Sequence, residues 1–187
     1  MDGLPRPGVR RRVSSEAHTG SDVSLVAAQI GRAPREPWRV RTRCKWGHPS
    51  VIVSPSTLGD GTPFPTLAWL TCPWLAEEVS ALESAGGVSR WRSCVAADQA
   101  ITDELLEADA ALREARARES SGRDECAGVG IAGQSDPLQV KCLHTHVALA
   151  LMDIADPVGR GVLAEVGDAC PDERCARLVL TMAEGLR

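Results

Sequence analysis

The clearest alternation in the chain covers residues 38–44, where apolar or threonine side chains take turns with arginines. A period of two is typical of a strand with one buried face. A second segment, residues 50–54, is apolar at its centre, and the sequence Gly47-His48-Pro49 between the two favours a turn. The pattern therefore predicts a β-hairpin with Cys44 at its tip.

Helical periodicity dominates the rest of the chain. Cys72-Pro73 separates an apolar segment, residues 67–71, from an amphipathic one, which predicts a buried strand followed by a helix with proline in its first turn. Asp136-Pro137 likewise predicts the start of a helix that runs to about Ile154. The dense charges over residues 105–118 predict a solvated helix face. Helices are expected over residues 22–30, 74–85, 88–120 with one break near Thr102, 137–154 and 172–183.

These elements predict an α+β fold, in which a small antiparallel β-region, a hairpin plus one strand, is packed by four to five helices. Residues 1–21 are rich in Arg, Pro, Gly and Ser and are expected to form a disordered tail. We expect residues 22–160 to form a single globular domain and residues 161–187 a C-terminal helical extension. A chain of 187 residues with 43% hydrophobic content is long enough to bury one core.

The seven cysteines bear on the cellular compartment. Their number is odd, and the N-terminus carries arginines without the apolar stretch of a secretory signal. Reduced thiols in the cytoplasm are therefore expected. No apolar run approaches the roughly 20 residues of a membrane-spanning helix.

Charge and glycine patterns argue against two classes of ligand. Residues 1–43 hold nine Arg against four acidic residues, a net of +5, and the remainder holds 12 basic and 21 acidic residues, a net of −9, which together give −4. The arginines lack an aromatic platform, which argues against nucleic acid. Residues 128–133 match the GxGxxG pattern but lack a βαβ context, which argues against a dinucleotide.

Three cysteines lie in distinctive positions: Cys44 at the expected turn, Cys72 at a helix start, and Cys142 near two histidines. Thiolates and imidazoles are ligands of zinc and of iron–sulfur clusters, although a cysteine often only packs in the core. At 100° per residue, Cys142 and His146 lie on one side of the expected helix, whereas His144 lies near its apolar stripe. The residues predict a metal site with Cys44, Cys72 and Cys142 as ligands and with His144, His146 or Cys126 as the fourth.

Seven short motifs follow one another over about residues 24–160. They are GRAPR at 31–35, RC at 43–44 with Gly47 and Pro49, DGTPFPT at 60–66, LTCP at 70–73, LE at 82–83 with Gly86, VKCLH at 140–144 and DPVG at 156–159. In order and spacing they resemble the bacterial family called domain of unknown function 501, which is common in actinobacteria. Cys44, Cys72, Cys142 and His144 match characteristic positions of that family, so the resemblance implies a shared site and favours His144 as the fourth ligand.

The resemblance implies no established activity. Members of the family are often encoded near enolase, a septum-formation initiator and an exopolyphosphatase-like phosphatase. The leading hypothesis is a cytoplasmic protein whose Cys/His site binds zinc or an iron–sulfur cluster and joins hairpin, strand and helix. One alternative is a thiol-dependent enzyme with a Cys–His pair, in which Cys72 or Cys142 is the nucleophile. The other is a non-catalytic module that binds an unknown protein partner in cell division or envelope processes.

Overall fold

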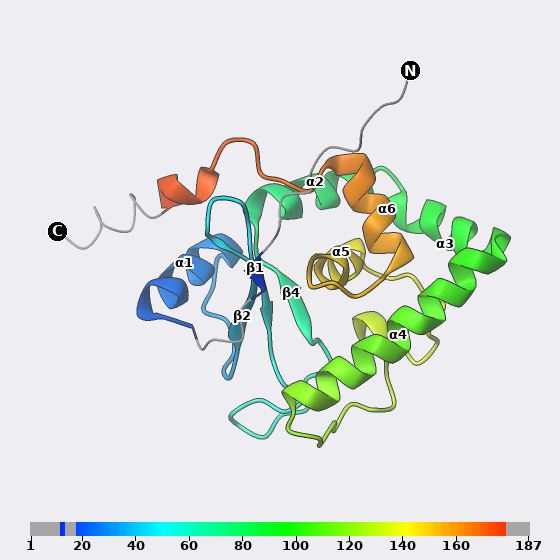
Figure 1. The fold of residues 1–187 in the computed structure, drawn as a ribbon, viewed down its shortest axis with the longest axis horizontal. Helices are drawn as coiled ribbons and strands as arrows, with labels where there is room; N and C mark the ends of the chain where they lie inside the picture. The colour runs from blue at the N-terminus through cyan, green and yellow to red at the C-terminus, as the bar shows by residue number, and fades with distance from the viewer. Residues whose placement is uncertain (1–11, 14–17, 179–187) are drawn as a thin grey trace.

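The computed structural model describes residues 12–13 and 18–178 and has an α+β fold (Figure 1). Its sheet is an antiparallel meander in the order β1-β2-β3-β4. The predicted hairpin plus one strand is confirmed. The additional edge strand, β1, falls within the expected tail, most of which lies outside the described residues. The strands are β1 (Arg12–Val13), β2 (Arg39–Arg43), β3 (Pro49–Val53) and β4 (Ala68–Leu70).

The two faces of the sheet carry different layers. In β2 burial alternates, as the sequence pattern predicts, whereas all five residues of β3 are buried. One face packs against α1 (Gly20–Ile30) through Val26, Val40 and Ile52. The other face contributes Val51 and Val53 to the main core, which the remaining helices complete. A strand covered on both faces has no need for alternation, which explains its apolar run.

Three helices in succession surround the main core: α2 (Pro73–Ser84), α3 (Gly87–Ala97) and α4 (Gln99–Glu119). The break in the long helical segment lies at Asp98 rather than near Thr102. The Asp98 side chain accepts hydrogen bonds from the backbone N–H groups of Ala100 and Ile101 and so caps α4.

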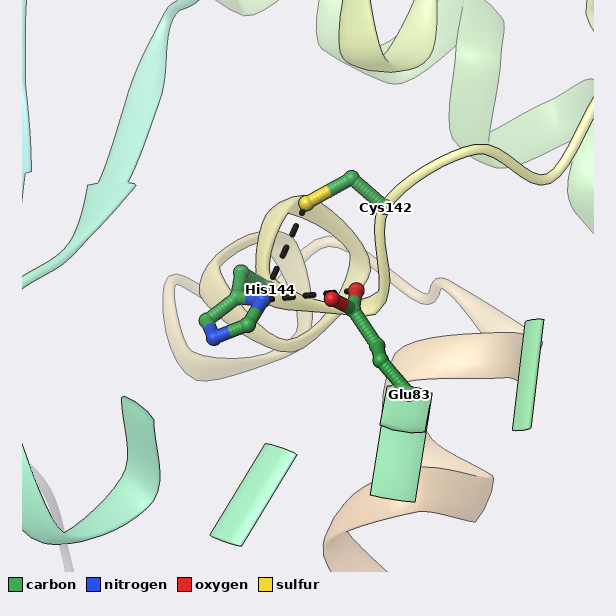
Figure 2. Close-up of side chains that lie close together, drawn as sticks. All are labelled: Glu83, Cys142 and His144. Atoms are coloured by element: carbon green, nitrogen blue, oxygen red, sulfur yellow. Dashed lines mark hydrogen bonds and ion pairs between the residues drawn. The ribbon is translucent and has the colours of Figure 1, made fainter. Parts of the chain in front are cut away.

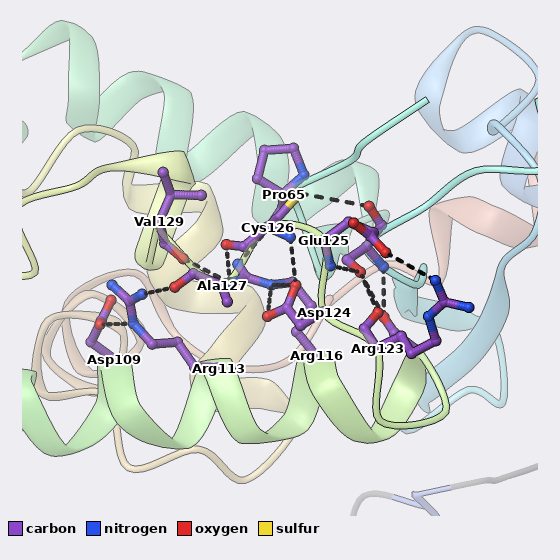
Figure 3. A network of polar contacts seen from close by, with 12 residues as sticks. Pro65, Asp109, Arg113, Arg116, Arg123, Asp124, Glu125, Cys126, Ala127 and Val129 are labelled. Carbon is purple, nitrogen blue, oxygen red and sulfur yellow. Dashed lines mark hydrogen bonds and ion pairs between the residues drawn. The ribbon is translucent and has the colours of Figure 1, made fainter. Parts of the chain in front are cut away.

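The charged half of α4 is not entirely a solvated face, which corrects the prediction for residues 105–118. The Arg116 side chain is fully buried, and its Nε lies 3.0 and 2.9 Å from the two carboxylate oxygens of Asp124 (Figure 3). Its other nitrogens donate to the backbone carbonyls of Pro65, Cys126 and Val129. A guanidinium needs several acceptors when it is buried, so this arginine ties two loops to α4.

The central helix, α5 (Leu143–Leu151), begins six residues later than the Pro137 start that the sequence predicts. Asp136 caps only a turn, in which its side chain accepts from the N–H of Leu138 and its carbonyl from that of Gln139. Six of the nine residues of α5 are buried, and α6, β4 and α2 lie around it. Figure 1 shows α5 near the centre of the molecule, between β4 and the helices α6 and α4.

The last labelled helix, α6 (Pro157–Val166), follows α5 closely and is capped by Asp156. It runs across the boundary expected at residue 160. A Cβ at Gly159 would lie 2.0 Å from the carbonyl oxygen of His146, so the two helices touch at their backbones. Residues 174–178 are helical, residues 172 and 173 of the expected helix are not, and its residues 179–183 lie outside the described part of the chain. Within residues 12–13 and 18–178, no helix combines the length and apolar character needed to cross a membrane.

Candidate metal centre

Cys142, His144 and Glu83 come together at the start of α5 (Figure 2). Nδ1 of His144 lies 3.8 Å from Sγ of Cys142 and 3.3 Å from Oε1 of Glu83. One ligand atom from each residue lies within 4.8 Å of the other two. In the part of the chain that the structure describes, no other three ligand atoms from His, Cys, Asp or Glu are so close.

Two helices position this cluster. Cys142 is the N-cap residue of α5, and His144 lies in its first turn. Glu83 lies in the last turn of α2 and accepts a hydrogen bond of 2.6 Å from the backbone N–H of Leu143. A carboxylate at a helix N-terminus satisfies an otherwise free N–H group and meets the positive end of the helix dipole. The packing of α2 on α5 therefore fixes the carboxylate beside the imidazole.

The contacts of Nε2, the second ring nitrogen of His144, show which nitrogen carries a hydrogen. Nε2 lies 3.1 Å from the carbonyl oxygen of Ala76 and 3.2 Å from Oγ of Ser80. That hydroxyl already donates to the Ala76 carbonyl, and a carbonyl only accepts. Nε2 must therefore carry the hydrogen. In the neutral ring, Nδ1 then presents its lone pair to Cys142 and Glu83.

The cluster alters the acidity of its own members. The hydrogen bond with Cys142, together with the Ala76 carbonyl and Glu83, raises the pKa of His144 to about 9 against the opposing effect of burial. For Cys142, burial raises the pKa, but the hydrogen bonds from His144 and from the N–H of Thr145 outweigh it, so the thiol pKa is lowered. A positive imidazole and a neighbouring thiolate thus stabilise each other.

A pocket of about 510 Å³ opens beside the cluster, between the sheet edge, α1 and α5. Cys142 and His144 form part of its wall, and Trp69 and Leu70 of β4 form another part. Ligand sites are commonly concave, mostly apolar and furnished with a few polar groups. The residues that line it are Gln29, Ile30, Thr66, Ala68, Trp69, Leu70, Thr71, Ala76, Cys142, His144 and Thr145.

The structure brings together two of the predicted ligands, Cys142 and His144, and places the others elsewhere. His146 is 1% exposed, and its Nδ1 lies 2.7 Å from the buried carboxylate of Asp156. Cys126 is buried near Arg116, where its Sγ lies 3.6 Å from the carbonyl oxygen of Ser56. Cys72 is buried at the start of α2, and Cys44 lies in the β2–β3 turn.

Sequence reasoning missed Glu83 as a member of the cluster. The residue occurs in the LE motif at 82–83, which was the only signal that could have identified it. One glycine of the GxGxxG segment serves packing, because Gly130 lies against Asp109 of α4, where a Cβ would lie 1.6 Å from Oδ1. That carboxylate also accepts from the N–H of Ile131.

Comparison with known proteins gives one family and no individual relative. No curated protein and no solved structure matches the chain significantly. A family model described as "Protein of unknown function (DUF501)" matches residues 40–164, which include Glu83, Cys142 and His144 and cover more than half of the chain. The chain therefore belongs to the DUF501 family, as its motifs predicted.

Proposed function

We propose that the chain binds a divalent transition metal ion, with zinc as the best fit, through Glu83, Cys142 and His144. The observation that carries the proposal is the orientation of His144. Its Nε2–H is held by the Ala76 carbonyl, while Nδ1 faces the thiol and the carboxylate. Metal-binding histidines usually donate their other N–H to a carbonyl or carboxylate in this way.

The donor set suits zinc. Thiolate sulfur, imidazole nitrogen and carboxylate oxygen are its three common protein ligands. A zinc ion held by three protein ligands keeps its fourth coordination position open. Cys142 and His144 also line the pocket, so a small molecule in it would lie beside the ion. A zinc ion in such a site supplies Lewis acidity and lowers the pKa of a bound water.

Metal binding must compete with protons at this site. With a pKa of about 9, His144 is protonated at neutral pH in the metal-free protein. An ion has to displace the Nδ1 proton, together with any proton on Cys142, so affinity should rise with pH. The lowered pKa of Cys142 reduces the proton competition on the sulfur.

Zinc affinity of the full chain tests the proposal. We expect Cys142→Ser, His144→Ala and Glu83→Gln each to weaken zinc binding at least tenfold in a chelator competition. Cys94→Ser is the matched control, because Cys94 is a partly buried thiol on α3 outside this cluster. Three variants that bind zinc as tightly as the control would refute the site.

A second candidate function follows from the contact between Sγ of Cys142 and Nδ1 of His144 at a pocket wall. A thiol within reach of an imidazole is the arrangement of a cysteine nucleophile with its base. This alternative predicts that chelator-treated protein reacts with iodoacetamide fastest at Cys142 and that His144→Ala slows that reaction. Equal rates at Cys142 and Cys94 would exclude it.

A further inference from the structure

Four cysteines outside the Glu83–Cys142–His144 cluster gather where α1, the β2–β3 turn, the start of α2 and the C-terminal segment meet. Burial raises the pKa of Cys72, with smaller contributions from Cys170 and Cys175, and burial also raises the pKa of Cys175, with smaller contributions from Cys44 and Cys170. Cys72, Cys170 and Cys175 are between 3% and 4% exposed, and Cys44 is partly buried. All four are free thiols.

One hydrogen bond and one longer ion-pair contact join the C-terminal segment to the β2–β3 turn. Nε1 of Trp46 donates to the carbonyl oxygen of Cys170 at 3.0 Å, and Nε2 of His48 lies 3.7 Å from the carboxylate of Glu173. The backbone N–H of Cys44 donates to the His48 carbonyl and closes that turn. Figure 1 shows the segment after α6 running back over α2 towards α1. This return path brings residues 170–175 to Cys44 and Cys72.

The side chain of Gln29 on α1 joins the same group. Its Nε2 donates to Sγ of Cys175 at 3.3 Å and to the carbonyl oxygen of Pro49 at 2.9 Å. An N–H group directed at sulfur stabilises negative charge on it, and such contacts surround thiolates that hold metals.

Buried polar atoms around the thiols are unsatisfied, which is an independent sign of a missing ligand. Among the described residues, Gln29 Oε1, His48 Nε2, Ser50 Oγ and Thr71 Oγ1 are buried and have no hydrogen-bond partner. Thr71 directly precedes Cys72, and its N–H donates to the Ser50 carbonyl. Unpartnered buried polar groups are rare in folded proteins and call for an ion, a water or a ligand.

We propose that Cys44, Cys72, Cys170 and Cys175 form a second, four-thiolate centre for a soft metal, and that its occupant is an iron–sulfur cluster. Four thiolates are the ligands of both structural zinc and iron–sulfur clusters. A single zinc ion, with Zn–S bonds of about 2.3 Å, would require sulfurs about 3.8 Å apart. Within the described residues, no three of these sulfurs lie within 4.8 Å of one another. This wider spacing favours an iron–sulfur cluster, which is larger than a single zinc ion, as the occupant.

The proposal replaces the predicted three-cysteine site with two separate sites. Cys44 and Cys72 take the thiols of residues 170–175 as partners, and Cys142 remains with His144 and Glu83. Cys170 and Cys175 lie beyond residues 40–164, the part that the family model matches. The centre does not depend on the proposed function, because the two sites share no ligand.

Metal analysis of the full chain, purified without oxygen, tests the proposal. We expect iron, sulfide and a brown colour in the wild type and in Cys94→Ser and Cys142→Ser, and their loss in the double variant Cys170→Ser/Cys175→Ser. Zinc in place of iron, lost in the same double variant, would support the four-thiolate centre and overturn its assignment to a cluster. A double variant with unchanged metal content would refute the centre.

A measurement on the wild type covers the case in which the double variant does not fold. A maleimide is added before and after chelation, and the labelled cysteines are identified by peptide mass spectrometry. We expect chelation to increase labelling at Cys44, Cys72, Cys170 and Cys175 together, with no change at Cys94. Labelling that rises only at Cys142 would refute this centre and leave the zinc site intact. Labelling that rises at the four cysteines of this centre but not at Cys142 would support the centre and count against the zinc site.

Discussion

His144 and His146 lie two residues apart on α5, and each has a carboxylate at Nδ1, yet their environments are opposite. His146 and Asp156 are almost wholly enclosed where α5 meets α6. The His144 side chain is 27% exposed and lies between α2 and the pocket, with Cys142 as a third group. The buried carboxylate–imidazole contact of His146 is thus structural. The contact of His144, which lies beside a thiol and a pocket, is a candidate for chemistry.

The largest expected effect comes from His146→Ala. Removal of the imidazole leaves the Asp156 carboxylate buried without its partner, which costs about 3–5 kcal/mol of the free energy of unfolding. Denaturant unfolding measures it. Zinc affinity of the molecules that remain folded should not change, because His146 takes no part in the candidate site. A loss below about 1 kcal/mol would show that the pair is not structural.

Gly159→Ala tests the same enclosed region through the backbone. Its Cβ would lie 2.0 Å from the His146 carbonyl oxygen and would push α5 and α6 apart, at a cost of about 1–3 kcal/mol. Gly128→Ala is the control, since no atom lies within 4 Å of the added methyl group. Thermal unfolding of the two variants should differ clearly, and equal melting temperatures would contradict the tight helix contact.

Glu83→Gln should cost less, about 0.5–1.5 kcal/mol, because the amide oxygen still accepts from the Leu143 N–H.

In the Glu83→Gln variant, the pKa of His144, followed by NMR, should fall from about 9 but remain raised. The Cys142→Ser variant should lower this pKa further, since the bond to Cys142 is the largest cause of the raised value. A raised histidine pKa stabilises the fold fully below about 6.5, and this stabilisation is lost as pH rises through about 9. Both variants should therefore lose less stability over that range than the wild type.

His144→Ala removes the raised pKa together with the ring, so its loss of stability should be largest below about pH 6.5 and shrink as pH rises through about 9. Its effect should appear in chemistry, as a slower reaction of Cys142 with iodoacetamide at neutral pH. The thiol then loses the hydrogen bond that lowers its pKa. An unchanged rate at Cys142 would show that the two groups do not interact in solution.

Local patterns were sufficient for the fold class and for most elements. The alternation over residues 38–44 predicted β2, and Cys72-Pro73 predicted the start of α2 correctly. The start of α5 was predicted wrongly because Asp136-Pro137 has the local features of a cap. The helix instead begins at Leu143, whose N–H is capped by Glu83, 60 residues earlier in the chain. No local pattern contains that contact.

The candidate site divides in the same way. Cys142 and His144 could be found because they are close in sequence and match a family motif. Glu83 could not, because α2 has to pack against α5 before its carboxylate reaches the imidazole. Arg116 is a similar case, since its charge predicted exposure, and the loop over residues 124–129 and the Pro65 carbonyl together supply the acceptors that allow burial.

The sequence by itself determined the family, the α+β class and the residue types available for metal chemistry, because these depend on local periodicity and motif order. The tertiary structure decided which thiol meets which partner. It placed His144 beside Cys142 and His146 beside Asp156, although the two histidines are neighbours on one helix. Two residues of helix turn by about 200°, so His144 and His146 point away from each other, and α2 and α6, which both pack against α5, give each histidine its own carboxylate.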